Sequence, residues 1–144
     1  MKKCFSILFF TTILMLICCD RPSKNRINRI WGINIHSLNI NIMEYEERWF
    51  LANGYCFIEL SLDKSSKNQI DSFKKQLLAM DAKPLASYGA EREFAFPSLF
   101  KDKEKKYLIH YSNGLFYSNK YRDNGHKIII LDEDENRIIL CYYI

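Results

Sequence analysis

EERWFLANGYCFIELSL, residues 46–62, places two apolar-rich runs on either side of an Ala-Asn-Gly sequence at 52–54. Asn and Gly both tolerate the positive φ of a tight turn, so Asn-Gly between such runs is typical of a β-hairpin. We therefore predict two antiparallel strands, at 46–51 and 55–62, joined at 52–54.

Upstream, residues 31–43 (WGINIHSLNINIM) alternate apolar and polar side chains, which is the period of a β-strand. The alternation changes phase at residues 36–37. Such a change predicts a bulge or a turn, here between two short strands.

Downstream, the period lengthens to that of a helix. Apolar residues recur three and four positions apart at Ile70, Phe73, Leu77, Leu78 and Met80. Ser66 followed by Gln69 resembles a capping box, and Pro84 disfavours helical geometry in the residue before it. We predict one amphipathic helix that begins near Ser66 and ends before Pro84.

The C-terminal third contains a second Asn-Gly pair, at 113–114, and an acidic stretch at 132–136, both between apolar runs and both typical of hairpin turns. Further strands are predicted at 93–96 (within a long, partly packed loop), 106–112, 115–121, 127–131 and 137–144. Together these elements predict an α+β fold. Its antiparallel sheet would have about six or seven short strands built from hairpins, with one amphipathic helix packed on one face and the other face more open.

The first twenty residues differ from the rest of the chain. Lys2 and Lys3 precede a sixteen-residue run, 4–19, that holds only apolar residues, one Ser and two Thr. As a helix this run would be about 24 Å long, shorter than the ~30 Å hydrocarbon core of a bilayer. A signal peptide is therefore expected rather than a membrane-spanning helix.

The run ends in Leu16-Ile17-Cys18-Cys19, which resembles the lipobox of bacterial lipoproteins. In that signal a Leu lies three residues before a Cys, and the Cys becomes the acylated first residue after cleavage. Cys19 fits the pattern, with Leu16 in place and the small Cys18 directly before the cut. The resemblance therefore implies lipidation of Cys19.

This resemblance implies a signal peptide at 1–18, followed by a lipid-modified Cys19 with a basic tether at 19–29. The remaining residues, 30–144, are predicted to form a single globular α+β domain. Two or more acyl chains anchor a protein stably to a bilayer. Asp20, directly after the acylated Cys, resembles the inner-membrane retention signal of enterobacterial lipoproteins. The implied location is the extracytoplasmic, periplasmic side of a bacterial cell membrane.

The residues after the apolar run allow a second interpretation. Four basic residues follow the run closely, Arg21, Lys24, Arg26 and Arg29, against two before it. Basic flanks tend to stay in the cytoplasm, so the alternative is an uncleaved anchor with a cytoplasmic domain. In the lipoprotein interpretation the same residues form a solvated tether that is attracted to anionic headgroups.

Positive charge is concentrated at the N-terminus. The chain has 21 Lys and Arg against 17 Asp and Glu, and six of the basic residues but only Asp20 of the acidic ones lie in residues 1–29. The predicted domain is therefore nearly neutral, and two acidic residues interrupt its cluster of Lys at 101–106. This composition excludes the basic footprint of a nucleic-acid-binding protein.

Two cysteines remain outside the leader, Cys56 and Cys141. In an oxidising compartment they could form a disulfide. The strand phase instead favours two free thiols, because Cys56 shares a face with Ile58 whereas Cys141 lies opposite Leu140. We expect one of the two thiols to be buried.

The sequence contains no motif of catalysis or metal binding. Its three histidines, His36, His110 and His126, have neither zinc spacing nor a local motif that links them to a cysteine. Residues 132–136, DEDEN, begin like a calcium-binding EF-hand loop, but Tyr143 stands where the bidentate Glu belongs, so a polar turn is favoured over calcium. We predict no catalytic residue, no metal site and no cofactor.

Aromatic residues make up 15% of the chain, and tyrosines gather in the C-terminal strands. Tyr combines rigid contact area with a polar tip, which suits protein recognition. We predict a docking surface for a protein partner at His110, Tyr117, Asn119 and Tyr121. The alternative is that Tyr fills half-buried strand positions because its β propensity is high.

The predicted function is therefore that of a small envelope lipoprotein, a membrane-anchored binding module rather than an enzyme. Its size and location are similar to those of envelope-anchored immunity or inhibitor proteins. The alternative is an envelope hydrolase or thiol enzyme that uses Cys56 or His110.

Overall fold

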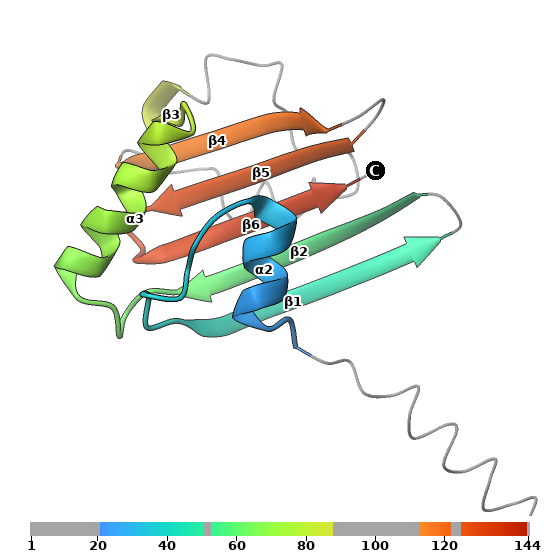
Figure 1. The fold of residues 1–144 in the computed structure, drawn as a ribbon, viewed down its shortest axis with the longest axis horizontal. Helices are drawn as coiled ribbons and strands as arrows, with labels where there is room; N and C mark the ends of the chain where they lie inside the picture. Colours follow the sequence, from blue (N-terminus) through green and yellow to red (C-terminus); the bar gives the residue numbers. More distant parts are fainter. Residues whose placement is uncertain (1–20, 51–52, 88–112, 122–124, 144) are drawn as a thin grey trace, which may run out of the picture.

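The computed structural model describes residues 21–50, 53–87, 113–121 and 125–143. The elements are α2 (Lys24–Trp31), β1 (Asn41–Phe50), β2 (Asn53–Ser61), α3 (Lys67–Ala79), β3 (Lys83–Pro84), the short helix η1 (Leu85–Ser87), β4 (Gly114–Tyr121), β5 (Gly125–Asp132) and β6 (Arg137–Tyr143). The strands form one six-stranded sheet in the order β1-β2-β6-β5-β4-β3, and every pairing is antiparallel (Figure 1). The predicted α+β class with an antiparallel sheet is confirmed.

β1 and β2 pair as the sequence predicts, but the Asn-Gly pair does not form their turn. Asn53 pairs with Phe50 and Gly54 with Trp49, so both residues belong to β2. Only residues 51–52, which lie outside the described ranges, separate the two strands. The pairing is confirmed, and the predicted position of the turn is wrong.

α3 lies on one face of the sheet, which we call the helix-side face. Ser66 caps this helix, since its side chain accepts the Gln69 N–H and the Gln69 side chain accepts the Ser66 N–H at 2.7 Å. Phe73 and Leu77 are buried against the sheet. Leu78 is 51% exposed, so the apolar stripe is narrower than predicted. The predicted amphipathic helix is otherwise confirmed.

A second helix, α2, covers the same face (Figure 1). Ser23 caps its first turn by accepting the Arg26 N–H at 3.2 Å. Gly32 ends it in the left-handed conformation at φ 71°, where its N–H donates to the Asn28 carbonyl at 2.8 Å. Both ends of α2 therefore carry the residues that helix termini require.

The burial of α2 corrects the prediction of a solvated tether. Ile27 and Trp31 lie in the core of the helix-side face, each only 1% exposed. The Trp31 indole N–H also donates to the Cys141 carbonyl of β6 at 3.1 Å. Residues 24–29 are therefore part of the folded domain, and the described sheet carries two helices rather than one.

Residues 33–40 connect α2 to β1 and do not form the predicted strands. Ile33, Ile35 and Leu38 are nevertheless buried in the core of the helix-side face. The Asn28 side chain accepts the Ile35 N–H at 2.9 Å, which holds the connection against α2. The alternating pattern thus marks residues buried in an irregular segment rather than a strand.

The opposite side of the sheet, which we call the second face, is also buried. Its core residues are Phe57, Leu85, Phe116, Ile128, Ile130, Ile139 and Cys141, all between 0% and 2% exposed. Leu85 belongs to η1 and the others belong to strands. The expectation that this face is more open is therefore wrong.

The C-terminal hairpin is confirmed, because β5 ends at Asp132 and pairs directly with Arg137, where β6 begins. The other predicted turn, at 113–114, stays a prediction, because the strand expected before it lies outside the described residues; Gly114 is the first residue of β4. Gly114 has φ 144°, and a Cβ there would collide with the Leu131 carbonyl. The strands predicted at 93–96 and 106–112 lie outside the described residues.

Candidate binding surface

Three strands contribute a group of neighbouring side chains at one end of the helix-side face. Tyr117 of β4 and Tyr142 of β6 pack against the core of this face. Asn119 lies two residues after Tyr117 and so shares its face. Asn119 pairs with Lys127 of β5, which in turn pairs with Tyr142. We call Tyr117, Asn119, Lys127 and Tyr142 the tyrosine row.

The tyrosine row lies at the margin of the helix layer. Figure 1 shows α3 across the ends of the sheet where β4 begins and α2 over β2 and β6, while the later half of β4 extends beyond both helices. Asn119 is exposed, and Tyr117, Lys127 and Tyr142 are half-buried. Each residue of the row is therefore held by the sheet and reaches solvent.

The two tyrosine rings pack against the core of the helix-side face. Tyr142 meets Trp31 edge to face, with ring centroids 6.5 Å apart and an interplanar angle of 75°. Tyr117 pairs across the ladder with the fully buried Ile129. An aromatic ring that is already ordered loses little conformational entropy when it binds a partner.

The structure brings together only part of the predicted docking surface. Tyr117 and Asn119 lie side by side on the helix-side face, as predicted. His110 lies outside the described residues. Tyr121 pairs with Gly125 at the end of β4, but its side chain lies outside the described part. The sequence prediction missed Lys127 and Tyr142, and their cross-strand register with Asn119 is the signal that joins them.

A second polar group lies beneath α2, also on the helix-side face. The Arg26 guanidinium and the Tyr45 hydroxyl both donate to the Glu47 carboxylate. Glu47 lies opposite Cys56 in the β1–β2 pairing. This cluster neutralises one carboxylate with one guanidinium and ties α2 to the edge of the sheet.

The surroundings of this cluster favour the protonated forms of the Cys56 thiol and the Tyr45 hydroxyl. Burial, and then the negative charge of Glu47, raises the pKa of the Cys56 thiol to about 12. Burial, followed by the hydrogen bond to Glu47, also raises the pKa of Tyr45 above its usual range. Cys56 is therefore a neutral thiol near pH 7, which makes it a poor nucleophile.

The two cysteines lie on opposite faces of the sheet, as the strand phase predicts. Cys56 belongs to the core of the helix-side face and Cys141 to that of the second face. Both thiols are free and both are buried, whereas the sequence indicated burial of one.

Charged residues also gather at one end of the second face. Arg137 Nε donates to Asp132 Oδ2 at 2.9 Å, and Arg137 Nη1 donates to Glu59 Oε1 at 3.3 Å. The Asp132 side chain is only 1% exposed. Since a buried carboxylate needs a partner, Arg137 has a structural role here.

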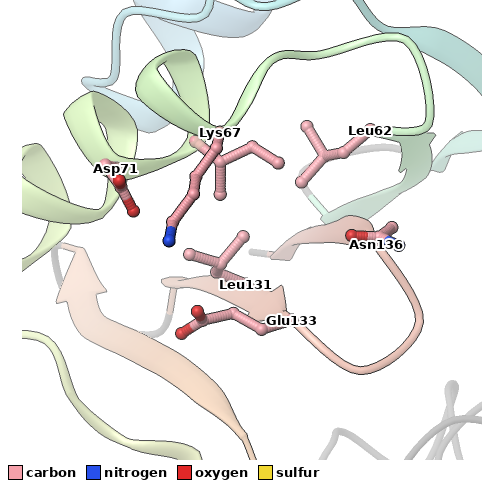
Figure 2. A pocket seen from close by; sticks show the side chains of 7 residues that line it. Leu62, Lys67, Asp71, Leu131, Glu133 and Asn136 are labelled. Atoms are coloured by element: carbon pink, nitrogen blue, oxygen red, sulfur yellow. The ribbon is translucent and has the colours of Figure 1, made fainter.

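A hollow of about 260 Å³ opens between the start of α3 and the β5–β6 turn (Figure 2). Its lining residues are Leu62, Lys67, Ile70, Asp71, Leu131, Glu133 and Asn136. Glu133 is already ion-paired with Lys74 of α3 at 2.5 Å. The hollow is smaller than the roughly 300–1,000 Å³ of most ligand pockets, and exposed Lys67 and Asn136 form part of its rim. It is therefore a weaker candidate than the tyrosine row.

Two further features are absent from the described residues. No group of three or more His, Cys, Asp or Glu side chains is arranged there to hold a metal ion. No helix in those ranges has the length and apolar character needed to cross a bilayer.

Comparison of the chain with protein-family models, curated proteins and solved structures finds no match.

Proposed function

We propose that this chain is a lipid-anchored binding protein of a bacterial envelope. Acyl chains on Cys19 hold the domain at the extracytoplasmic surface of the membrane, and the tyrosine row captures a protein partner. The proposed activity is to bind that partner and block its surface, as an inhibitor or immunity protein does, without catalysing a reaction.

The tyrosine row carries this proposal. It combines two half-buried aromatic rings with the exposed amide of Asn119, on strands that belong to one continuous sheet. Protein interfaces are enriched in Tyr, because the ring supplies apolar contact area and the hydroxyl supplies a hydrogen bond. A rigid sheet presents these groups without a loop that must first become ordered.

The anchor supports the same function through concentration. A domain tethered to a bilayer meets a partner in that envelope at an effective concentration set by the short tether. The Leu16 to Cys19 sequence is the basis for this part of the proposal. Lipidation would thus let a surface of modest affinity remain occupied.

The thiol-enzyme alternative has less support. Cys56 is 2% exposed and its pKa is raised to about 12, so its thiolate is scarce at neutral pH. A catalytic cysteine needs a lowered pKa and access to substrate. Cys141, on the opposite face, is fully buried.

Site-specific photo-crosslinking tests the proposal. A photoreactive amino acid at Asn119 should give one dominant crosslinked protein in the envelope of the native host. The same residue placed at Lys75, which is exposed on α3, should not give this product. Tyr117→Ala should reduce the Asn119 crosslink, while Tyr117→Phe, which retains the ring, should reduce it less. Absence of a product at Asn119, or the same product at both positions, would contradict the proposal.

A further inference from the structure

α2 begins at the β1 edge of the sheet and runs toward its centre. Near its start, Arg26 donates to Glu47 of β1. At its end, the Trp31 indole donates to the Cys141 carbonyl of β6, two strands further in. Figure 1 likewise shows the start of α2 beside β1. The chain therefore enters the domain at the β1 edge.

The proposed lipidation site, Cys19, lies only two residues before the first described residue of the domain, Arg21. Only Asp20 separates Cys19 from Arg21, and two extended residues span at most about 7 Å. Pro22 is buried, so the chain is already part of the domain one residue later. An acylated Cys19 lies at the headgroup level, and Arg21 must then lie at that level too.

We propose that the β1 edge of the domain rests on the phospholipid headgroup layer, so that the sheet stands edge-on and the tyrosine row lies two to four strands above the membrane. This inference rests on the proposed lipidation of Cys19. Its occupant is the bilayer itself, whose phosphate groups would pair with the exposed Arg21 side chain.

One exposed residue of the β1 edge, Met43, fits this contact. Met43 is 66% exposed, and the pairing of β1 with β2 shifts register between Ile42 and Glu44, on either side of it. Such a bulge turns a side chain away from the regular ladder. An exposed flexible apolar side chain on the same edge strand can enter the headgroup region, where it is removed from water.

The outer surface of the helix layer has no chain entry point that would bring it to the bilayer. Its exposed residues include the polar Asn25, Arg29, Ser72 and Lys75, and the apolar Leu78 near the end of α3. The charges at the start of α2 are also satisfied internally, because the Lys24 ammonium donates to the Leu38 carbonyl at 2.5 Å. An edge-on orientation is favoured over one with the helices against the bilayer, because the chain enters the domain at the β1 edge.

This orientation determines which molecules can reach the binding surface. β4 is four strands away from β1, and strands lie about 4.8 Å apart, so Asn119 would stand roughly 19 Å above the edge strand. The partner of the tyrosine row would then be a soluble protein or the protruding domain of another envelope protein, rather than a segment buried in lipid.

Fluorescence quenching by labelled headgroups tests the orientation. The lipidated protein, with acyl mass on Cys19 verified, is reconstituted into phospholipid vesicles that contain a headgroup-attached nitroxide quencher. A thiol-reactive fluorophore is placed at Met43→Cys, Ser72→Cys or Asn119→Cys in separate samples. The unsubstituted protein is the labelling control, since Cys56 and Cys141 are both buried.

We expect the probe at position 43 to lose most of its fluorescence, the probe at 72 to lose less, and the probe at 119 to lose least. Strongest quenching at 72 or 119, or equal quenching at all three positions, would overturn the edge-on orientation and leave the lipid anchor intact. Absence of acyl mass on Cys19 would overturn both the anchor and the orientation.

Discussion

On the helix-side face of the sheet, the core combines strand residues with side chains from α2 and α3, whereas the described core of the second face consists of strand residues and Leu85 of η1. Both cores are almost completely shielded from solvent. They differ in what surrounds them: the helix-side face is bordered by the tyrosine row, and the second face ends in the buried Asp132–Arg137 ion pair. The face built with helices thus leaves the ends of β4, β5 and β6 that carry the tyrosine row available for recognition.

Large-to-small substitutions compare the packing of the two faces directly. Trp31 and Phe57 are the largest buried side chains of their respective faces. If both cores are equally tight, Trp31→Ala and Phe57→Ala should each lower the free energy of unfolding by about 3–5 kcal/mol. Urea denaturation measures both.

Trp31→Phe is the matched control for the first substitution, because it retains a ring but removes the hydrogen bond to the Cys141 carbonyl. It should cost less than Trp31→Ala. A loss below about 1 kcal/mol for Phe57→Ala would mean that the second face is loosely packed, and the two faces would no longer be equivalent.

The ion pair of the second face should show the next largest effect. Arg137→Ala would leave the buried Asp132 carboxylate without its main partner, and we expect a loss of about 3 kcal/mol. Arg48→Ala is the control, since Arg48 pairs with Glu46 but its side chain is 74% exposed. That exposed pair should contribute less than about 1 kcal/mol. Equal losses for the two variants would show that burial does not strengthen the Arg137 pair.

Ionisation of the Cys56 thiol, which lies on the helix-side face, should have a smaller effect on the free energy of unfolding, and only at alkaline pH. In the unfolded chain the pKa of the Cys56 thiol is 9.0, whereas burial in the folded domain raises it to about 12. Its contribution to stability is complete below pH 9 and is lost as the pH rises toward 12, because only the unfolded chain then releases the proton.

Cys56→Val removes this titration and keeps an apolar side chain. The unsubstituted protein should therefore lose more stability than Cys56→Val between neutral pH and about pH 10, when both are unfolded in urea. Identical losses would show that Cys56 ionises as readily in the folded domain as in the unfolded chain.

Much of the fold follows from local sequence patterns. The capping box at Ser66 predicted α3, and the acidic turn at 132–136 predicted the last hairpin. Strand alternation correctly placed Cys56 and Cys141 on opposite faces. These features depend on residues close in sequence, whose spacing reveals their geometry.

The errors arise where tertiary contacts decide. α2 looks like a tether because three of its eight residues are basic and two are Asn, although Ser23 and Gly32 are helix-end signals that could have indicated it. Ile33 and Ile35 alternate like a strand but are buried in a connection. Asn53 and Gly54 carry a turn signature, yet the register with β1 places both in β2.

The candidate site was predictable only in part, for a related reason. Tyr117 and Asn119 share a face because they are two residues apart on one strand. Lys127 and Tyr142 join them only through the registers of β4 with β5 and of β5 with β6. Those registers depend on the whole sheet and cannot be read from any single strand.

The mass of the membrane-extracted protein tests the central proposal most directly, with native chain and Cys19→Ala compared. We expect the native chain to begin at Cys19 and to carry the added mass of acyl chains, and we expect Cys19→Ala to carry none. An intact chain that still begins at Met1 and lacks acyl mass would contradict the lipoprotein proposal. The domain would then face the cytoplasm, where an envelope partner could not reach the tyrosine row.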